Sequence, residues 1–143
     1  MTKSEQLKAL YTDCGLSKED VFKHQHYVII TRTGIEKIQF AKNIKVSFEM
    51  IHYGNDECVV KAIATTDNER VETFGSAKYG GKIKNDNGKW VDTGSTTTWY
   101  LAEMAEKRAL SRAVLKITKA YSLGVFGEDE AEDFRRTNQT QEG

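Results

Sequence analysis

A single long helix is the feature that most constrains what this chain can fold into. The run WYLAEMAEKRALSRAVLKI, residues 99–117, repeats its apolar residues at helical spacing, and the pattern predicts a helix from near Trp99 to about Ser122. One side of this helix carries only small side chains, namely Ala102, Ala105, Ala109 and Ala113. Small side chains let a helix axis approach a sheet or another helix closely. Larger apolar residues fill the remaining buried positions, namely Leu101, Leu110, Val114 and Ile117.

The residues before this helix predict a β-meander. Segments 43–53 and 57–66 alternate apolar and polar residues, and 70–79 follows them after a turn at Asp67-Asn68. The glycine-rich run 80–90 is expected to be a mobile loop or a hairpin with NDNG at its tip. We therefore predict an α+β fold, with an antiparallel β-meander of three to five strands and one long helix packed across it.

Short helices are expected in the N-terminal part. Residues 2–14 have an apolar stripe, a cap at Thr2 or Ser4 and a stop at Gly15. Residues 33–43 open with a capping-box pattern in which Thr33 caps the helix and Glu36 reaches back. The run HYVIIT, residues 26–31, is rich in β-forming residues and lies between these two helices.

Charge divides the chain into a body and a tail. Residues 1–127 carry 19 Lys and Arg against 15 Asp and Glu, so that this predicted single α+β domain has a balance of +4. Residues 128–143 are acidic and then polar, which predicts a poorly ordered tail. This tail is either a plain solvated end or a segment that docks onto recombination or replication proteins. No apolar run approaches the ~20 residues of a membrane span. The start lacks a secretory signal, so we expect a cytoplasmic protein with reduced, buried thiols at Cys14 and Cys58.

Cations on the long helix form the first candidate site. Arg108, Arg112 and Lys116 are spaced four residues apart and therefore share one ridge of the helix, next to the alanines. The ridge thus lies at the margin of the buried face, where its charges must be satisfied by acids within the fold or by phosphates. Structural pairing with acids remains open as the simpler interpretation.

Cations and aromatic residues also gather just before the helix. Phosphates bind Lys and Arg, and unstacked bases stack on aromatic rings at roughly 1–3 kcal/mol each, so this mixture is typical of a site for single-stranded nucleic acid. The candidate residues outside the ridge are Lys82, Lys84, Lys89, Trp90, Trp99 and Tyr79. Plain packing of each aromatic ring is the alternative.

Three stretches together resemble a known group of proteins. The runs ITRTGIEKI, VETFGSA and AEMAEKRALSRAVLKI…LGVFGEDEAEDF, within residues 27–133, are similar to single-strand annealing proteins of phage and prokaryotic recombination systems. In this resemblance Arg108 and Arg112 occupy the two arginine positions of the helix motif and Glu106 its acidic position. Gly34 and Lys37 match the motif of the earlier helix.

The resemblance implies a function and a fold. It implies a non-enzymatic protein that binds or anneals single-stranded DNA in phage-type recombination or replication, in the host cytoplasm if a phage encodes it. It also implies a homo-oligomer, and a shared core in which a β-meander carries a long helix.

Other functions are weighed against this one. A small protein–protein module, such as a phage accessory factor with a structural arginine ridge, is the main alternative. No GxGxxG, Walker A, HExxH or GxSxG motif is present, and we predict no cofactor and no enzymatic activity. Two weaker metal hypotheses remain. One is a nuclease site built from Glu49, Asp56, Glu57 and Glu72, and the other joins His24 and His26 with Cys14 or Cys58.

Overall fold

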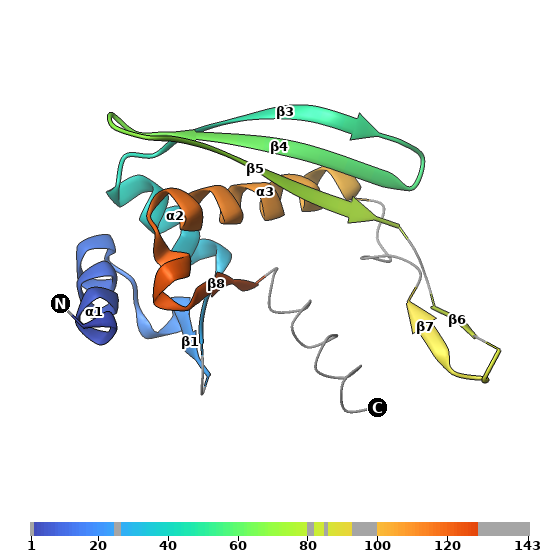
Figure 1. Ribbon diagram of the computed structural model, residues 1–143, viewed down its shortest axis with the longest axis horizontal. Helices are drawn as coiled ribbons and strands as arrows, with labels where there is room; N and C mark the ends of the chain where they lie inside the picture. The colour runs from blue at the N-terminus through green and yellow to red at the C-terminus, as the bar shows by residue number, and fades with distance from the viewer. Residues whose placement is uncertain (1, 25–26, 80–81, 85, 93–99, 129–143) are drawn as a thin grey trace.

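The predicted α+β architecture is confirmed in a computed structural model (Figure 1), which describes residues 2–24, 27–79, 82–84, 86–92 and 100–128. The helices are α1 (Lys3–Cys14), α2 (Arg32–Ala41) and α3 (Leu101–Ile117), with short 3-10 turns η1 (Lys18–Asp20) and η2 (Ala120–Leu123). The strands of the large sheet are β3 (Lys45–Tyr53), β4 (Glu57–Thr65) and β5 (Arg70–Lys78). The shorter strands are β1 (Val21–Lys23), β2 (Val28–Ile30), β6 (Lys82–Lys84), β7 (Trp90–Asp92) and β8 (Val125–Gly127).

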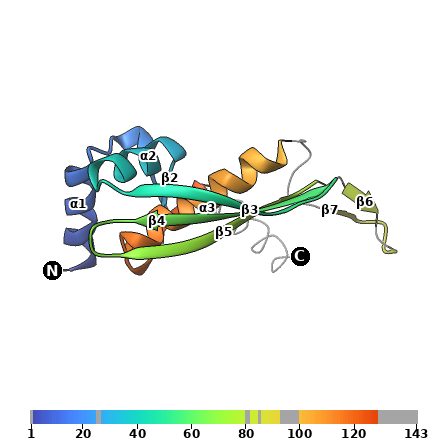
Figure 2. The ribbon, with the colours of Figure 1, turned by 90° about the horizontal axis from the view of Figure 1, so that it is seen from above.

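The elements form layers with α3 in the middle (Figures 1 and 2). The antiparallel sheet β3–β4–β5 covers one side of α3, and α1, α2 and the small sheet β1–β2–β8 lie on its other side. Side chains at Ala105, Ala109 and Ala113 face the interior and are completely buried, as the alanine spacing predicts. Leu115 is equally buried. The exposed residues of α3 are Glu103, Glu106, Lys107 and Lys116, so the helix keeps one polar stripe in solvent.

Gly75 on β5 explains how closely α3 approaches the sheet. A Cβ atom at this position would overlap the backbone oxygen of Ala105 and the backbone nitrogen of Ala109. The neighbouring Thr73 hydroxyl donates a buried 2.8 Å hydrogen bond to the Ala109 carbonyl. A residue without a side chain on the strand and alanines on the helix therefore bring the two backbones together.

Strand alternation in the large sheet also agrees with the prediction. Along β4 the residues facing α3 are buried, whereas the intervening residues on the open face are half-buried. Strand β3 is paired with β4 from Lys45 to Tyr53, with an irregularity between Met50 and His52. The turn predicted at Asp67-Asn68 joins β4 to β5, and a Thr66 N–H bond to the Glu69 carbonyl closes it.

Several predicted boundaries were wrong. Helix α2 begins two residues earlier than the Thr33 capping box predicts, because the Thr31 hydroxyl accepts from the Gly34 N–H at 3.2 Å and caps the helix. Glu36 instead forms an ion pair with Arg32, 3.2 Å away on the same helix. Helix α1 is capped by Thr2 and stopped by Gly15 in a left-handed conformation, as predicted.

The end of α3 differs as well. The helix stops at Ile117 rather than near Ser122, and Lys119 adopts a left-handed conformation with φ of 62°. The chain then forms strand β8, which pairs in parallel with β2. The sequence pattern did not predict β8, because a strand of three residues has too little periodicity to detect. The glycine-rich run 80–90 contains a hairpin, with Lys84 opposite Trp90.

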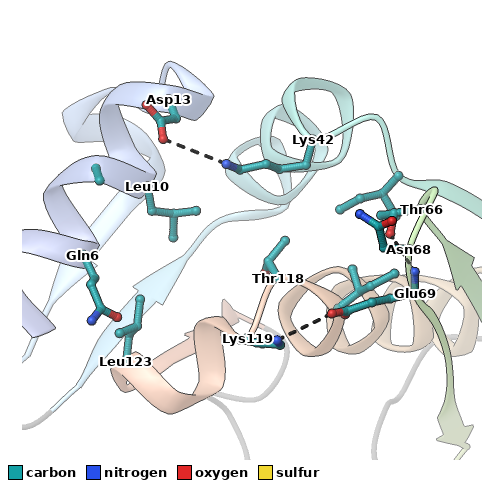
Figure 3. A pocket seen from close by; sticks show the side chains of 13 residues that line it. Gln6, Leu10, Asp13, Lys42, Thr66, Asn68, Glu69, Thr118, Lys119 and Leu123 are labelled. Carbon is teal, nitrogen blue, oxygen red and sulfur yellow. Dashed lines mark hydrogen bonds and ion pairs between the residues drawn. The ribbon is translucent and has the colours of Figure 1, made fainter. Parts of the chain in front are cut away.

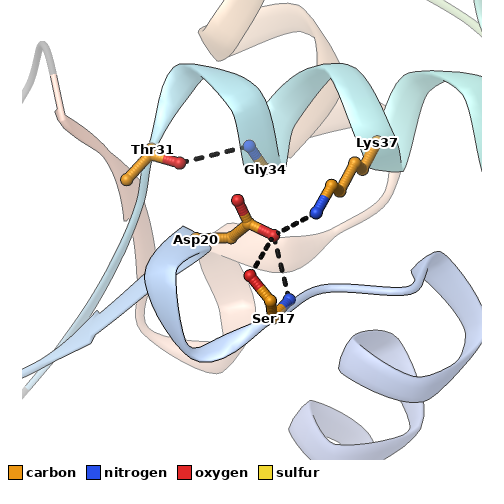
Figure 4. A network of polar contacts seen from close by, with 5 residues as sticks. All are labelled: Ser17, Asp20, Thr31, Gly34 and Lys37. Atoms are coloured by element: carbon orange, nitrogen blue, oxygen red, sulfur yellow. Dashed lines mark hydrogen bonds and ion pairs between the residues drawn. The ribbon is translucent and has the colours of Figure 1, made fainter.

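An ion pair between η1 and α2 stabilises the lower layer, which consists of α1, α2 and the sheet β1–β2–β8 (Figure 4). Lys37 Nζ lies 2.6 Å from Asp20 Oδ2, and the same oxygen accepts from the Ser17 N–H and hydroxyl at 2.9 and 3.1 Å. The Asp20 side chain is buried, and hydrogen bonds from Lys37 and Ser17 hold its pKa below the ordinary value. A Cβ at Gly34 would overlap Ile30, which fixes α2 close to η1 and β2.

Candidate nucleic-acid interface

Two arginines of α3 reach around the free edge of the large sheet. Arg108 Nη1 donates to the Ser76 carbonyl at 2.6 Å, and Arg112 Nη1 donates to the Phe74 carbonyl at 2.8 Å. Both arginines are half-buried. They follow each other by one helical turn, as the predicted ridge requires.

The register of the sheet explains why these two carbonyls are available. Phe74 and Ser76 lie opposite Lys61 and Val59 of β4 and alternate with the residues that bond to β4. In an antiparallel pair, alternate residues turn their N–H and C=O groups away from the neighbouring strand. No described strand pairs with the outer edge of β5, and these outward carbonyls accept hydrogen bonds from the two guanidinium groups.

The arginines were expected to meet acids within the fold or phosphates, and backbone carbonyls are a third kind of partner that was not predicted. Backbone carbonyls orient the guanidinium groups without neutralising them. Among the described residues, no ion pair within 4 Å involves Arg108 or Arg112. A guanidinium has five N–H donors, so one carbonyl bond leaves most of them available for an anion. The simpler interpretation, pairing with acids, has no support in the described part of the chain.

An exposed aromatic ring lies beside these cations. Phe74 is 52% exposed on the open face of the sheet, and its own carbonyl is the acceptor for Arg112. Phe74 was not among the candidate residues predicted from the sequence. The alternation of RVETFGSAK could have identified it, because a face that presents Gly75 to α3 must present Phe74 to the other side.

The other residues of the predicted ridge and site are placed as follows. Lys116 is exposed in the last turn of α3, where a positive charge also stabilises the helix dipole. Tyr79 is half-buried and packs against the core, which favours the packing alternative for its ring. Lys89 is exposed in the hairpin turn. Trp99 lies outside the described residues.

The hairpin β6–β7 follows β5 in the chain (Figure 1). Its residues therefore come directly after the strand whose carbonyls accept from Arg108 and Arg112. Lys82 and Lys84 are on β6 and Trp90 on β7, with Lys84 paired to Trp90 in the backbone register. The structure describes their backbone. Their proposed contacts with a ligand stay predictions.

The motif residues of the resemblance have local structural explanations. Gly34 and Lys37 both contribute to the Asp20 contacts of the lower layer. Glu106 is exposed on α3. Only the arginines combine a structural contact with free donors, and for this reason they carry the candidate interface.

The two predicted metal sites are not formed by the described residues. No group of three or more His, Cys, Asp or Glu side chains in this part of the chain is placed to hold a metal ion. Glu49 and Glu72 each lie 3.3 Å from Lys61 Nζ on the open face of the sheet, which makes them ion-pair partners. His24 stacks on Tyr27, and His26 lies outside the described residues.

Both cysteines are free and buried, as predicted. Burial raises the pKa of the Cys14 and Cys58 thiols above the ordinary value. Cys58 Sγ lies 3.4 Å from the sulfur of Met50 across the sheet. Thiols in this state are poor nucleophiles, since the thiolate is the reactive form.

A cleft of about 450 Å³ separates α1 from the body of the fold (Figure 3). Its cations are already paired, with Lys42 3.9 Å from Asp13 and Lys119 3.5 Å from Glu69. None of the predicted site residues lines this cleft. It is therefore a weaker candidate for a phosphate than the β5 edge, where no described acid forms an ion pair with the two guanidinium groups.

In the part of the chain that the structure describes, every helix is too short or too polar to cross a membrane. Comparison with protein families, with curated proteins and with solved structures found no match for this chain.

Proposed function

We propose that this chain binds single-stranded DNA without catalysing a reaction on it, and that annealing of complementary strands in phage-type recombination or replication is the process it serves. The observation that carries the proposal is the pair of guanidinium groups at the β5 edge, which the carbonyls of Phe74 and Ser76 hold in place and which form no ion pair with a described acid. A fixed cation loses less conformational entropy on binding than a mobile one.

The proposed path of the strand follows this edge. Successive arginines one helical turn apart are separated by about 6 Å along the helix axis. Phosphates would contact Arg108, Arg112 and the exposed Lys116, while a base stacks on the open side of Phe74. The lysines and Trp90 of the β6–β7 hairpin would extend the path beyond β5.

Anisotropy of a labelled oligo-dT, titrated between roughly 50 and 200 mM salt, tests the proposal. Phe74→Ala should weaken binding by about 5- to 150-fold, which corresponds to the loss of one stacked base. Phe40→Ala is the matched control, because Phe40 is 89% exposed on α2 and belongs to no proposed contact. Salt-independent binding, or equal loss in both variants, would contradict the proposal.

A second pair of variants examines the phosphate contacts. Lys116→Ala should reduce the salt slope by about 0.7, the value expected for one phosphate contact to a single strand. Lys8→Ala, which removes an exposed lysine from α1, should leave the slope unchanged. Oligo-rU and duplex DNA in the same assay distinguish DNA, RNA and double-strand preferences. Recovery of the intact oligonucleotide after incubation with Mg²⁺ tests whether the protein is a metal-dependent nuclease.

The alternative of a protein–protein module with a structural arginine ridge makes a different prediction. It requires Arg108 and Arg112 to be buried against carboxylates, within the fold or between subunits. The half-buried arginines bond to carbonyl oxygens instead. Absence of oligo-dT binding even at low salt would favour this alternative.

A further inference from the structure

The two edges of the large sheet differ in what bonds to them. At β5 the arginines of α3 donate hydrogen bonds to outward carbonyls, which hinders pairing of this edge with another strand. At β3 the opposite holds, since no described strand pairs with its outer edge (Figure 2). All nine residues of β3 except Val46 are exposed.

The side chains of β3 are unusually apolar for an exposed edge. Phe48, Met50 and Tyr53 are 38%, 54% and 65% exposed, and Ile51 is 50% exposed at the irregular position. By the register, Phe48 and Met50 lie opposite Ala62 and Val60, on the side of the sheet that faces α3. They stay uncovered because α3 lies mainly beneath β4 and β5. A long, exposed and apolar edge strand is a site for pairing with another chain.

The register also tells which backbone groups face this free edge. Lys61 is opposite Phe74, whose carbonyl is turned away from β4, so the backbone groups of Lys61 face β3 and its partner Glu49. Residues of β3 that alternate with Glu49, namely Val46, Phe48 and Met50, therefore direct their N–H and C=O groups outward.

We propose that β3 pairs with β3 of a second copy of this chain in antiparallel orientation about Ser47, which joins the two large sheets into one. In this register Val46 lies opposite Phe48 of the second copy, and each such pair exchanges two backbone hydrogen bonds. The apolar side chains of both residues meet on the side of the sheet that faces α3. The proposal does not depend on DNA binding.

Charge complementarity selects both the occupant and the register. Lys45 and Glu49 are placed symmetrically about Ser47, so the pairing sets each lysine opposite the glutamate of the other copy, twice across the twofold axis. Both residues are exposed on the open face, where the Glu49 carboxylate lies between the Lys61 ammonium of its own chain, 3.3 Å away, and the free edge. They belong to the pairs that share no backbone hydrogen bond, in which side chains approach most closely. Pairing about Glu49 instead would oppose two glutamates.

Phe48→Pro tests the edge. Proline removes an outward N–H that bonds to no neighbouring strand in this chain, so the change is compatible with an edge strand. Light scattering over a range of protein concentrations should show a wild-type dimer, and the variant should raise its dissociation constant about tenfold or more. Phe74→Pro is the matched control, since it removes the equivalent outward N–H from the opposite edge and should leave the dimer intact.

Two charge variants test the register without altering the backbone. Lys45→Glu and Glu49→Lys each place like charges opposite one another in a homodimer, so each variant alone should be monomeric where the wild type is dimeric. An equimolar mixture of the two restores opposite charges at both positions and should form the heterodimer. Circular dichroism of each variant confirms that it is folded.

Three results would overturn the proposal. They are a monomeric wild type at every concentration, an undisturbed dimer in Phe48→Pro, and charge variants whose mixture is no more dimeric than either alone. Oligo-dT binding by the folded Phe48→Pro monomer is measured in parallel, because it reports on the proposed function separately from self-association.

Discussion

The guanidinium group of Arg112 on α3 donates a 2.8 Å hydrogen bond to the carbonyl oxygen of Phe74 on the edge strand β5. One contact thus joins a cation, an exposed aromatic ring and an otherwise unpaired backbone acceptor. Arg108 repeats the contact one turn earlier at Ser76. The arginines therefore have a structural role that is measurable independently of any ligand.

Replacing either arginine by methionine should lower the free energy of unfolding by about 1 kcal/mol, because one hydrogen bond to a carbonyl is lost. Urea denaturation monitored by circular dichroism measures the effect. Lys107→Met on the exposed side of the same helix should change stability by less than about 0.5 kcal/mol. Equal effects at Arg112 and Lys107 would show that the carbonyl contact contributes nothing.

Gly75→Ala should destabilise the fold by about 1–3 kcal/mol or more, since the added methyl group overlaps the backbone of α3 and neither backbone can move freely. Thermal and urea unfolding both report this loss. Gly54→Ala is the control, because the nearest atom there belongs to the His52 side chain, which can move away. A variant at Gly75 as stable as the one at Gly54 would mean that α3 lies farther from β5.

The Asp20–Lys37 pair should make stability depend on acid pH. The pKa of Asp20 is lowered in the folded protein, so its contribution is present above about pH 3.9, the ordinary value, and is lost as the pH falls through the folded pKa. Asp20→Asn should cost about 1–3 kcal/mol at pH 7 and much less at pH 2. Asp13→Asn, at an exposed pair 3.9 Å long, serves as control and should cost less than about 1 kcal/mol at pH 7. The same loss at both pH values for Asp20→Asn would exclude a charged role.

Lys61 should govern the titration of Glu72 on the open face of the sheet. The hydrogen bond and charge of Lys61 are the main causes that lower the pKa of Glu72, and Arg70 contributes less. Lys61→Met should therefore raise the Glu72 pKa toward its ordinary value, whereas Arg70→Met should raise it by a smaller amount. Carboxyl chemical shifts followed by NMR across the acid range give both values. A larger effect at Arg70 would reverse the assignment.

Periodicity alone determined the main elements of this protein. The alanine spacing of 99–117 predicted a helix in close contact with a sheet, and Ala105, Ala109 and Ala113 are completely buried there. Strand alternation predicted the meander and the faces of β3 and β4. These features follow from local patterns, because burial on one face imposes a period of 3.6 or 2 on the sequence.

Short elements and caps were harder to predict from the sequence. Thr33 was the predicted N-cap, whereas Thr31 caps α2 at a place where Gly34 lies close to Asp20 and Ile30. Strand β8 depends on pairing with β2, nearly a hundred residues earlier in the chain. Such choices rest on contacts distant in sequence, which a local pattern does not contain.

The candidate site divides in the same way. The sequence by itself determined that Arg108, Arg112 and Lys116 share one ridge at the margin of a buried helix face. The tertiary structure alone decided what the ridge meets. It is the outer edge of β5, whose outward carbonyls orient the arginines beside Phe74, while no described acid forms an ion pair with them. An edge strand is defined by the strand that is missing beside it, and this property exists only once the sheet has formed.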